Sequence, residues 1–304
     1  MTLPEISGSE ARGPLAAGPR DLTPREFEVF RGLVHAHSGI TLSPEKRPML
    51  YARLARRLRA LGLETFTDYH RHLEERDLRG EELRRLINAV TTNKTDFFRE
   101  AHHFRYLAEQ WVPALRDRAA RAGVRSARIW SAGCSSGEEP YTIAVTLLEA
   151  LGGAAGWDVK IIATDLDTDV LAQAQTGVYQ AARVEPVPGP LLSRYFLRGR
   201  GQSAGLVKVR DEVQALIMFR RLNFMEEPWP IRGPLDVIFC RNALIYFDRP
   251  TQRRILEGFL ARLAPDGVLF LGHSESIHGL VEGLTHVGNT IYRRAGAPSA
   301  AAAR

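Results

Sequence analysis

The chain has 304 residues, of which 44% are hydrophobic and 25% are charged, the balance of a soluble globular protein. This composition excludes wholesale disorder, and the length favours two domains over one. No apolar run approaches the roughly 18 residues that mark a membrane span. The first 20 residues lack the apolar core of a signal peptide, so we expect a cytoplasmic protein.

Cysteine content and net charge limit the chemistry further. Cys134 and Cys240 are too few for a disulfide framework or a four-thiolate metal site, so we expect free thiols. The histidines show no third ligand in register, which predicts that there is no metal site. The formal net charge of +6 admits nucleic acid, anionic lipid or acidic protein as a partner. Because both halves of the chain share the basic excess, any basic patch must be local.

The first part of the chain predicts only helices. Thr23-Pro24 with Glu26 is typical of a capped helix start, and Ser43-Pro44 begins a second helix in the same way. Shorter helices are expected over 65–76 and 80–90. The predicted organisation is a disordered segment at 1–20, a helical domain at 21–90, a linker and the start of the catalytic domain at 91–125, a second domain at 126–294 and a flexible tail at 295–304.

Beyond residue 125 apolar strands alternate with helices, which predicts a mainly parallel sheet covered on both faces. A closing hairpin is expected around Gly288-Asn289. The stretch 180–222 breaks the alternation, and we expect it to form an inserted β subdomain with small antiparallel strands at 206–209 and 214–222. The other predicted elements are strands at 128–133, 159–165, 235–240 and 267–272, and helices at 138–151, 168–175 and 249–263.

Three of the predicted strands end in residues suited to a ligand, and the carboxyl ends of parallel strands are where ligands bind. The loop after the first strand is rich in small residues and continues into Glu138 and Glu139, which would repel a pyrophosphate and suit a cationic group. A plain glycine turn with acids at a helix start is the alternative. Asp165 ends the second strand, where an acid binds a ribose diol, and Asp167 or Asp169 caps the next helix. Polar residues, Cys240-Arg241-Asn242, follow the third strand.

These strand ends together describe a nucleoside pocket without a phosphate clamp. The ligand that combines a nucleoside with a cationic, amino-acid-like appendage is S-adenosylmethionine. The triplet Asp165-x-Asp167-x-Asp169 starts like a calcium loop. However, Val170 stands where such a loop needs glycine and Thr176 where it needs glutamate, so a calcium site is rejected.

Three longer motifs resemble the CheR family of chemotaxis-receptor glutamate methyltransferases, and the resemblance spans about residues 20–293. The motifs are Thr91–Glu100 (TTNKTDFFRE), Trp130–Tyr141 (WSAGCSSGEEPY) and Phe239–Phe247 (FCRNALIYF). The resemblance implies an α/β fold: a Rossmann-like S-adenosylmethionine-dependent methyltransferase sheet, a small all-helical N-terminal domain and an inserted antiparallel β subdomain.

The resemblance also implies roles for single residues. Arg99 and Tyr246 match the residues that flank the transferred methyl group. No general base is expected, because a glutamate carboxylate is already ionised at neutral pH. The residues that match cofactor contacts are Asn93, Thr95, Arg99, Glu138, Asp165, Asn223, Phe224, Cys240, Arg241 and Asn242.

Two surfaces are candidates for receptor binding. The helix that begins near Lys46 places leucines on one stripe and Arg53, Arg56 and Arg59 away from it. In the family such a helix meets the acidic methylation helices; an ordinary solvated face and a nucleic-acid patch are the alternatives. Gly199, Gly201 and Gly205 match the loop of members that dock a C-terminal receptor peptide. A bracing hairpin is the alternative there.

The sequence therefore predicts a monomeric enzyme that transfers methyl groups from S-adenosylmethionine to glutamates of chemotaxis receptors, with S-adenosylhomocysteine as product. We expect no nucleic-acid partner and no insertion into the membrane. The alternative is a non-catalytic cofactor-sensing or nucleic-acid-binding module on the same fold.

Overall fold

The computed structural model describes residues 21–296, so the expected N-terminal segment and residues 297–304 of the expected tail lie outside it. The described chain divides into two compact units. The helical unit comprises residues 21–30 and 43–89, and the catalytic unit comprises residues 31–42 and 90–296. Within the described residues, no helix combines the length and the apolar character needed to cross a membrane.

The helices of the first part begin where the sequence predicts them. Thr23 Oγ1 accepts the Glu26 N–H (3.2 Å) and Glu26 Oε2 accepts the Thr23 N–H (3.0 Å), which is a complete capping box. Thr65 Oγ1 accepts the Asp68 N–H (3.0 Å) and so caps its helix, but Ser43 makes no side-chain cap and a 3₁₀ turn precedes the second helix. The elements are α1 (Pro24–Ser38), η1 (Pro44–Lys46), α2 (Arg47–Leu61), α3 (Phe66–Glu75) and α4 (Glu81–Val90).

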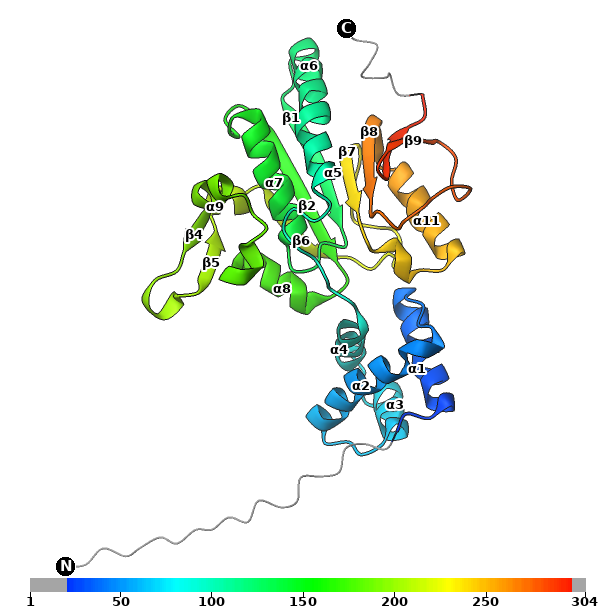
Figure 1. The fold of residues 1–304 in the computed structure, drawn as a ribbon. Coiled ribbons are helices and arrows are strands. Elements are labelled where there is room, and N and C mark those ends of the chain that lie inside the picture. The colour runs from blue at the N-terminus through cyan, green and yellow to red at the C-terminus, as the bar shows by residue number, and fades with distance from the viewer. Residues whose placement is uncertain (1–20, 297–304) are drawn as a thin grey trace, which may run out of the picture. The chain divides into compact units, whose positions relative to one another are not determined.

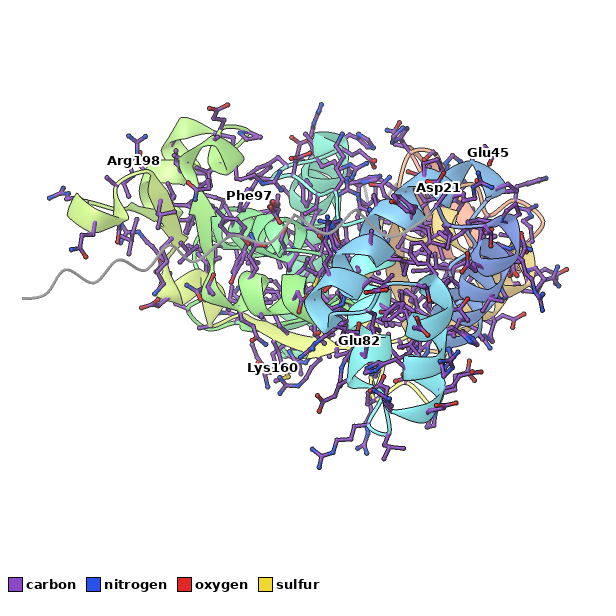
Figure 2. The ribbon with its side chains drawn as sticks, turned by 90° about the horizontal axis from the view of Figure 1, so that it is seen from below. Asp21, Glu45, Glu82, Phe97, Lys160 and Arg198 are labelled. Carbon is purple, nitrogen blue, oxygen red and sulfur yellow. The ribbon has the colours of Figure 1, made fainter. Side chains whose placement is uncertain are left out.

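A small core holds the helical unit together. Leu50, Leu54 and Leu58 of α2 have no exposed surface, which confirms the predicted leucine stripe. Glu82, labelled in Figure 2, is buried in this core and accepts hydrogen bonds from Arg57 (2.9 and 2.7 Å) and from the Tyr69 hydroxyl (2.8 Å). Arg57 is therefore committed to the core rather than to the surface of α2.

The catalytic unit is built on a seven-stranded sheet with the order β6-β2-β1-β7-β8-β10-β9 (Figure 1). The strands β6, β2, β1, β7 and β8 are parallel, and β10 is antiparallel to both of its neighbours. The order reverses at β1, which places a ligand-binding crevice at the carboxyl end of that strand. The strands are β1 (Ser126–Ala132), β2 (Asp158–Asp165), β6 (Ile217–Arg221), β7 (Leu235–Cys240), β8 (Leu263–Leu271), β9 (Leu284–Gly288) and β10 (Ile291–Arg294).

Helices pack on both faces of this sheet, as predicted. On β7, Val237 and Phe239 belong to the core beneath the helices that precede and follow β1, whereas Ile238 and Cys240 belong to the core beneath the last helix. A continuous helical run occupies most of the expected 91–125 linker. The helices are α5 (Ala101–Tyr106), the π-helix η2 (Leu107–Trp111), α6 (Val112–Ala122), α7 (Glu138–Leu151), α8 (Thr168–Thr176), η5 (Leu244–Tyr246) and α11 (Arg249–Leu260).

The insertion is a separate three-stranded antiparallel sheet with the order β3-β5-β4, seen beside the main sheet in Figure 1. The prediction for 206–209 is confirmed, but the prediction that 214–222 belongs to the insertion is wrong. That segment forms β6, which pairs in parallel with β2 at the edge of the main sheet. Only Phe219 of β6 is buried, so the strand lacks the apolar run of a central strand. The insertion contains β3 (Val178–Gln180), η3 (Ala181–Val184), α9 (Gly189–Tyr195), β4 (Phe196–Arg198), η4 (Gly201–Ser203) and β5 (Leu206–Val209), and α10 (Asp211–Gln214) follows it.

Candidate active site

The loop after β1 makes two sharp changes of direction that require glycine. Gly133 has φ +84°, and a Cβ on it would lie 3.2 Å from the Ala243 side chain. Gly137 has φ +95°, and a Cβ there would lie 2.9 Å from the Tyr179 hydroxyl. Because no other residue fits either position, the loop brings its backbone close to the end of β2 and turns directly into α7.

Asp165, at the end of β2, is tied to this loop. The N–H of Ser135 donates to Oδ2 (2.7 Å) and the N–H of Asp167 donates to Oδ1 (3.0 Å). Burial raises the pKa of Asp165 to about 6, in spite of these hydrogen bonds. A carboxylate accepts up to about four hydrogen bonds, so two acceptor positions stay available for a ligand such as a diol.

Asn93 joins the start of the catalytic unit to the same place. Its Nδ2 donates to Asp167 Oδ2 (2.6 Å), and its carbonyl accepts the Ser135 hydroxyl (2.9 Å). Asp167 also caps α8 through the N–H of Asp169 (2.8 Å), which settles the capping prediction in favour of Asp167. The Asn93 side chain is thus used to fix the loop, and its predicted cofactor contact stays a prediction.

Glu138 is fully buried at the first position of α7 and faces an arginine of the insertion. Arg183 Nη2 lies 2.5 Å from Glu138 Oε1 and 2.6 Å from the Thr95 carbonyl oxygen. The Ser136 hydroxyl donates to the other carboxylate oxygen of Glu138 (2.7 Å). The Arg183 side chain is 41% exposed, so the charge that neutralises Glu138 lies next to solvent.

Glu139, the next residue, has a different partner. Arg241 Nη1 lies 3.2 Å from Glu139 Oε2, and the Ser131 hydroxyl donates to Oε1 (2.7 Å). The Arg241 side chain is only 3% exposed. Burial raises the pKa of Glu139, although Arg241 and the Ser131 hydrogen bond act in the opposite direction. Both acids of the loop motif are therefore paired with arginines.

Arg99 lies in a turn between two residues with left-handed backbones, Phe98 (φ +55°) and Glu100 (φ +56°). Its Nη1 donates to the Lys94 carbonyl (2.8 Å), and its own carbonyl accepts a hydrogen bond from Arg241 Nη2. The Arg99 side chain is half-buried, so it stays accessible at this edge of the unit.

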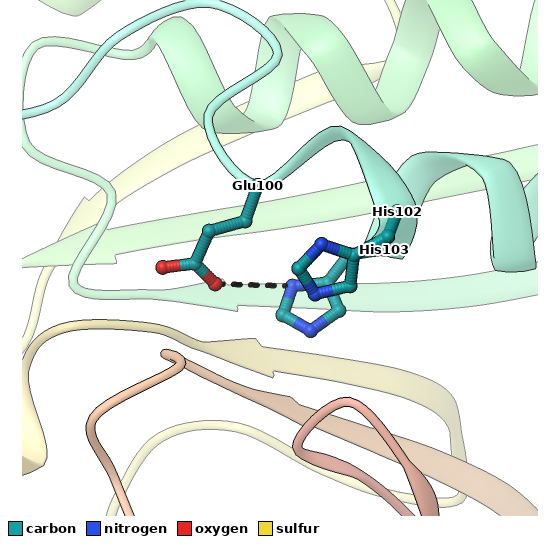
Figure 3. A group of neighbouring side chains, drawn as sticks. All are labelled: Glu100, His102 and His103. Atoms are coloured by element: carbon teal, nitrogen blue, oxygen red, sulfur yellow. Dashed lines mark ion pairs between the residues drawn. The ribbon is translucent and has the colours of Figure 1, made fainter.

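Glu100 begins a short cluster with the two histidines that follow it, in which an ion pair joins Glu100 to His103 (Figure 3). Glu100 Oε2 lies 3.5 Å from His103 Nδ1 and 3.3 Å from Arg241 Nη2, and Oε1 lies 2.9 Å from His273 Nδ1. Burial would raise the pKa of Glu100, but its bond to His273 and the charge of Arg241 lower it to about 2. Burial and the nearby arginine lower the pKa of His103 to about 4.

The same cluster has the composition of a metal site, because one ligand atom from each of Glu100, His102 and His103 lies within 4.8 Å of the others. Arg241, however, already places a fixed positive charge beside the Glu100 oxygen that a metal ion would need. Like charges at this distance repel strongly in a buried site. The cluster is therefore better explained as an ion-pair network than as a metal centre.

The motif after β7 is held by an acid that we did not single out from the sequence. The buried Glu275 accepts the N–H groups of Asn242 (2.9 Å), Ile245 (3.3 Å) and Gly272 (2.6 Å). Burial raises its pKa, although these hydrogen bonds lower it. Cys240 is a free thiol with no exposed surface, so it lines the strand end rather than supplying a reactive group. Asn242 adopts φ +57° and is half-buried.

Leu222, directly after β6, donates its N–H to the Asp165 carbonyl (2.9 Å), and Asn223 and Phe224 follow it in the chain. The Asn223 side chain donates to the His37 carbonyl (2.6 Å). The Phe224 ring packs against Trp130 and Trp229, with centroid distances of 6.4 and 5.4 Å.

Residues 37–41, which the sequence assigned to the helical domain, thus pack within the catalytic unit. The N–H of Thr41 donates to the Tyr246 carbonyl (2.8 Å), and Ile40 forms a β-bridge with Phe247. Tyr246 itself is half-buried at the end of η5. No sequence signal marks 37–41 as part of the site, because the segment looks like an ordinary loop between helices.

Each of the two candidate receptor surfaces lies within one unit, α2 in the helical unit and the insertion in the catalytic unit. On α2, Arg56 and Arg59 are exposed and Arg53 is half-buried. In the insertion, Gly199 and Gly205 line a cavity of about 350 Å³, whereas Gly201 does not. Arg198, labelled in Figure 2, and Glu185 give this cavity one charge of each sign. Its other lining residues are Ala181, Ala182, Val184, Leu192, Leu206 and Val207.

Comparisons with known proteins agree with this geometry. Residues 93–293 match the CheR methyltransferase, SAM binding domain, and residues 25–91 match the CheR methyltransferase, all-alpha domain. The chain is 46% identical over 270 residues to chemotaxis protein methyltransferase 2 of Pseudomonas aeruginosa, covering 89% of this chain and 93% of that protein. It is 45% identical over 272 residues to the chemotaxis protein methyltransferase of Salmonella typhimurium, covering 89% and 90% of the two chains. The predicted α/β methyltransferase fold is confirmed, and the chain belongs to the CheR methyltransferase family.

Proposed function

We propose that this protein transfers a methyl group from S-adenosylmethionine to glutamate side chains of chemotaxis receptors. The observation that carries the proposal is the convergence of the three motifs at one edge of the sheet. There the Ser135 N–H donates to Asp165, Arg183 pairs with Glu138, and Arg241 donates to the Arg99 carbonyl. The names of the relatives, chemotaxis protein methyltransferases, supply the substrate class.

The residues at this edge fit the cofactor. Asp165 has acceptor capacity left for the two hydroxyls of a ribose. Glu138 carries the negative charge that suits the cationic amino-acid end, provided that the exposed Arg183 moves aside. The aromatic ring of Phe224, beside the end of β2, is of the type that packs against an adenine. No phosphate-binding loop is needed for such a ligand.

The chemistry requires orientation rather than a base. When bound, the cofactor supplies a methyl group on a sulfonium. A glutamate carboxylate oxygen would form a bond to the methyl carbon as the carbon–sulfur bond breaks, which gives the methyl ester and releases S-adenosylhomocysteine. That carboxylate has an ordinary pKa of about 4.3 and is ionised at neutral pH. Arg99 would hold it in line through charge-assisted hydrogen bonds, and the Tyr246 hydroxyl would hydrogen-bond the carboxylate or the amino-acid end of the cofactor.

Methyl transfer is tested with labelled S-adenosylmethionine and membranes that carry chemotaxis receptors of the same organism. We expect base-labile label on the receptors, and we expect Arg99→Ala to lower kcat more than it lowers cofactor affinity. Cofactor binding without transfer to any of these receptors would support the non-catalytic alternative. A shift of labelled nucleic acid in a gel, without methylation, would support the nucleic-acid alternative.

We also propose that α2 is the surface that meets the acidic helices of the receptor. The support is the exposed basic pair Arg56 and Arg59 opposite a buried leucine stripe. Arg56→Glu with Arg59→Glu should raise the KM for receptor and weaken its dependence on salt, because steering between opposite charges is screened by ions. Arg76→Glu with Arg79→Glu, at two exposed arginines between α3 and α4, is the control for the same change of net charge. If the KM of the double variant depends on salt as in the wild type, the basic face of α2 is an ordinary solvated face.

The cavity of the insertion is proposed as a dock for the C-terminal peptide of a receptor. β4 is an edge strand of the small sheet, so a peptide can add to it through main-chain hydrogen bonds. Docking would raise the local concentration of methylation sites. Ala182→Trp, in η3, fills the cavity, whereas Ala204→Trp places the same side chain on the connection between β4 and β5, outside the cavity lining. Binding of a receptor C-terminal pentapeptide by wild type and Ala204→Trp, but not by Ala182→Trp, would support the dock. Absence of saturable binding to wild type would exclude it.

A further inference from the structure

We propose that Arg241 is a positioning residue, whose buried guanidinium fixes the main chain of Arg99, and that its side chain does not contact the cofactor. The proposal rests on the proposed function, because that function assigns Arg99 to the substrate carboxylate. It replaces the expectation from sequence that Arg241 belongs to the cofactor-binding residues.

The surroundings of Arg241 leave no room for a ligand. Its side chain is 3% exposed and lies over the Phe104 ring, with the guanidinium carbon 5.4 Å from the ring centroid. One terminal nitrogen pairs with Glu139 (3.2 Å) and the other lies 3.3 Å from Glu100 and donates to the Arg99 carbonyl. The Nε atom is enclosed by protein and has no hydrogen-bond partner among the described residues. The side chain is therefore enclosed by residues of the chain itself, with 3% of its surface exposed.

The turn that contains Arg99 needs such support. Phe98 and Glu100 adopt φ +55° and +56°, a region that residues with a side chain rarely occupy. Backbone of this kind persists only where surrounding contacts hold it, and it concentrates at functional sites. Besides the bonds of the Phe98 N–H to Thr142 Oγ1 (3.2 Å) and of the Arg99 N–H to the Asp96 carbonyl (3.3 Å), the turn is supported by Arg241, which contacts the Arg99 carbonyl and the Glu100 carboxylate.

A guanidinium suits this task better than an ammonium. Arg241 holds carboxylates of two elements, Glu139 on α7 and Glu100 before α5, and the carbonyl of Arg99 at the same time. The rigid fork of arginine presents several N–H groups in fixed directions, whereas lysine is a point charge on a flexible stem. Arg241→Lys therefore keeps the buried charge balance but cannot keep all three contacts.

The test separates turnover from cofactor binding. In Arg241→Lys we expect kcat to fall about 100-fold, the effect of misplacing an orienting group by roughly 1 Å. The Kd for S-adenosylmethionine, measured by calorimetry, should change by less than about threefold. The matched control is Arg118→Lys, which changes another arginine that pairs with two carboxylates, Asp236 (2.6 Å) and Asp266 (3.0 Å). Asp236 lies at the amino end of β7, away from the site, so we expect kcat to stay unchanged there. A parallel loss of kcat and cofactor affinity in Arg241→Lys would show a cofactor contact and overturn the proposal.

Two further measurements address the route through Arg99. Arg241→Lys should add no further loss of kcat to Arg99→Ala, because both changes remove one function. Amide hydrogen exchange of peptides that cover residues 96–100 should be faster in Arg241→Lys than in wild type or Arg118→Lys. Additive losses, or unchanged exchange, would overturn the proposal. The exchange experiment also decides it if the wild-type protein methylates no receptor, the result that would refute the proposed function instead.

Discussion

Two neighbouring glutamates at the start of α7 pair with arginines that differ in solvent exposure. Glu138 pairs with Arg183, which comes from the insertion and is 41% exposed, and Glu139 pairs with Arg241, which is 3% exposed. Both carboxylates are buried, with Glu138 0% and Glu139 8% exposed, so the main difference lies in the exposure of their partners. Arg183 can leave its glutamate and become hydrated, whereas Arg241 is enclosed by protein and cannot reach water.

This difference assigns the two acids to different tasks. A pair that can open is suited to exchange its arginine for the cationic end of a ligand. A pair that cannot open is suited to hold the architecture. Removal of Arg241 leaves Glu139 uncompensated in the interior, and removal of Glu139 leaves Arg241 with Glu100 as its one remaining partner among the described carboxylates. Asp165 is a third case, a carboxylate held by backbone N–H groups without an arginine.

The largest expected effect is that of Glu139→Ala on stability. The change leaves the buried Arg241 without its partner on α7, so we expect the free energy of unfolding to fall by about 3–5 kcal/mol. Urea denaturation measures the loss. Glu138→Ala is the matched control and should lose clearly less, because Arg183 can turn toward water. Equal losses would show that exposure of the partner does not distinguish the two pairs.

The next effect is that of Asp165→Ala on cofactor binding. Ribose hydroxyls without their acceptor should weaken the binding of S-adenosylmethionine by about 1–3 kcal/mol in calorimetry. Asp169→Ala, an exposed change on the following helix, is the control. Unchanged affinity would remove Asp165 from the pocket.

Asp165 also makes a pH prediction. Its folded-state pKa of about 6 lies above its ordinary value of 3.8, so the folded protein retains a proton that the unfolded chain releases. The resulting stabilisation is complete below the ordinary value and is lost as the pH rises to about 6. Asp165→Asn should abolish this part of the pH dependence of unfolding. In the wild type, the ionised carboxylate that can accept two ribose hydrogen bonds is the main form above about pH 6. An identical pH profile for Asp165→Asn and wild type would contradict the assignment.

Arg183→Ala tests the pair of Glu138 by removing its arginine. We expect a loss of about 1.5–3 kcal/mol in unfolding free energy, because the buried Glu138 carboxylate then keeps the Ser136 hydroxyl but not its arginine. Because Glu138 no longer has a competing cation, the affinity for S-adenosylmethionine should stay the same or rise. Arg194→Ala, which removes another arginine–glutamate pair of the insertion, controls for general effects. A marked loss of affinity in Arg183→Ala alone would mean that Arg183 itself holds the ligand.

The smallest effect is expected at the surface. Arg221 and Glu226 form an ion pair 2.9 Å long in which the side chains are 38% and 59% exposed. Arg221→Ala should change the unfolding free energy by about 0–1 kcal/mol, because exposed pairs gain little over hydration. Thermal unfolding measures this. A loss as large as that of Glu139→Ala would contradict the expectation that buried ion pairs contribute more to stability than exposed ones.

Much of this protein is determined by the sequence itself. The capping box at Thr23, the strand Leu235–Cys240 and the helix Glu138–Leu151 lie where local pattern predicts them. These features depend on hydrophobic periodicity and on hydrogen bonds between near neighbours in the chain. The motifs at the strand ends could be found in the same way, since parallel strands bring their carboxyl ends together.

Only the tertiary structure decided which arginine pairs with each of the two glutamates. Nothing near Glu138 or Glu139 in sequence indicates Arg183 or Arg241, which lie 45 and 102 residues further along the chain. The strand Ile217–Arg221 joined the main sheet because β2 offers it a free edge, although its own composition suggested the insertion. Segment 37–41 joined the site in the same way. Burial and pairing are properties of the packed chain, because they depend on which distant segments exclude water from each charge.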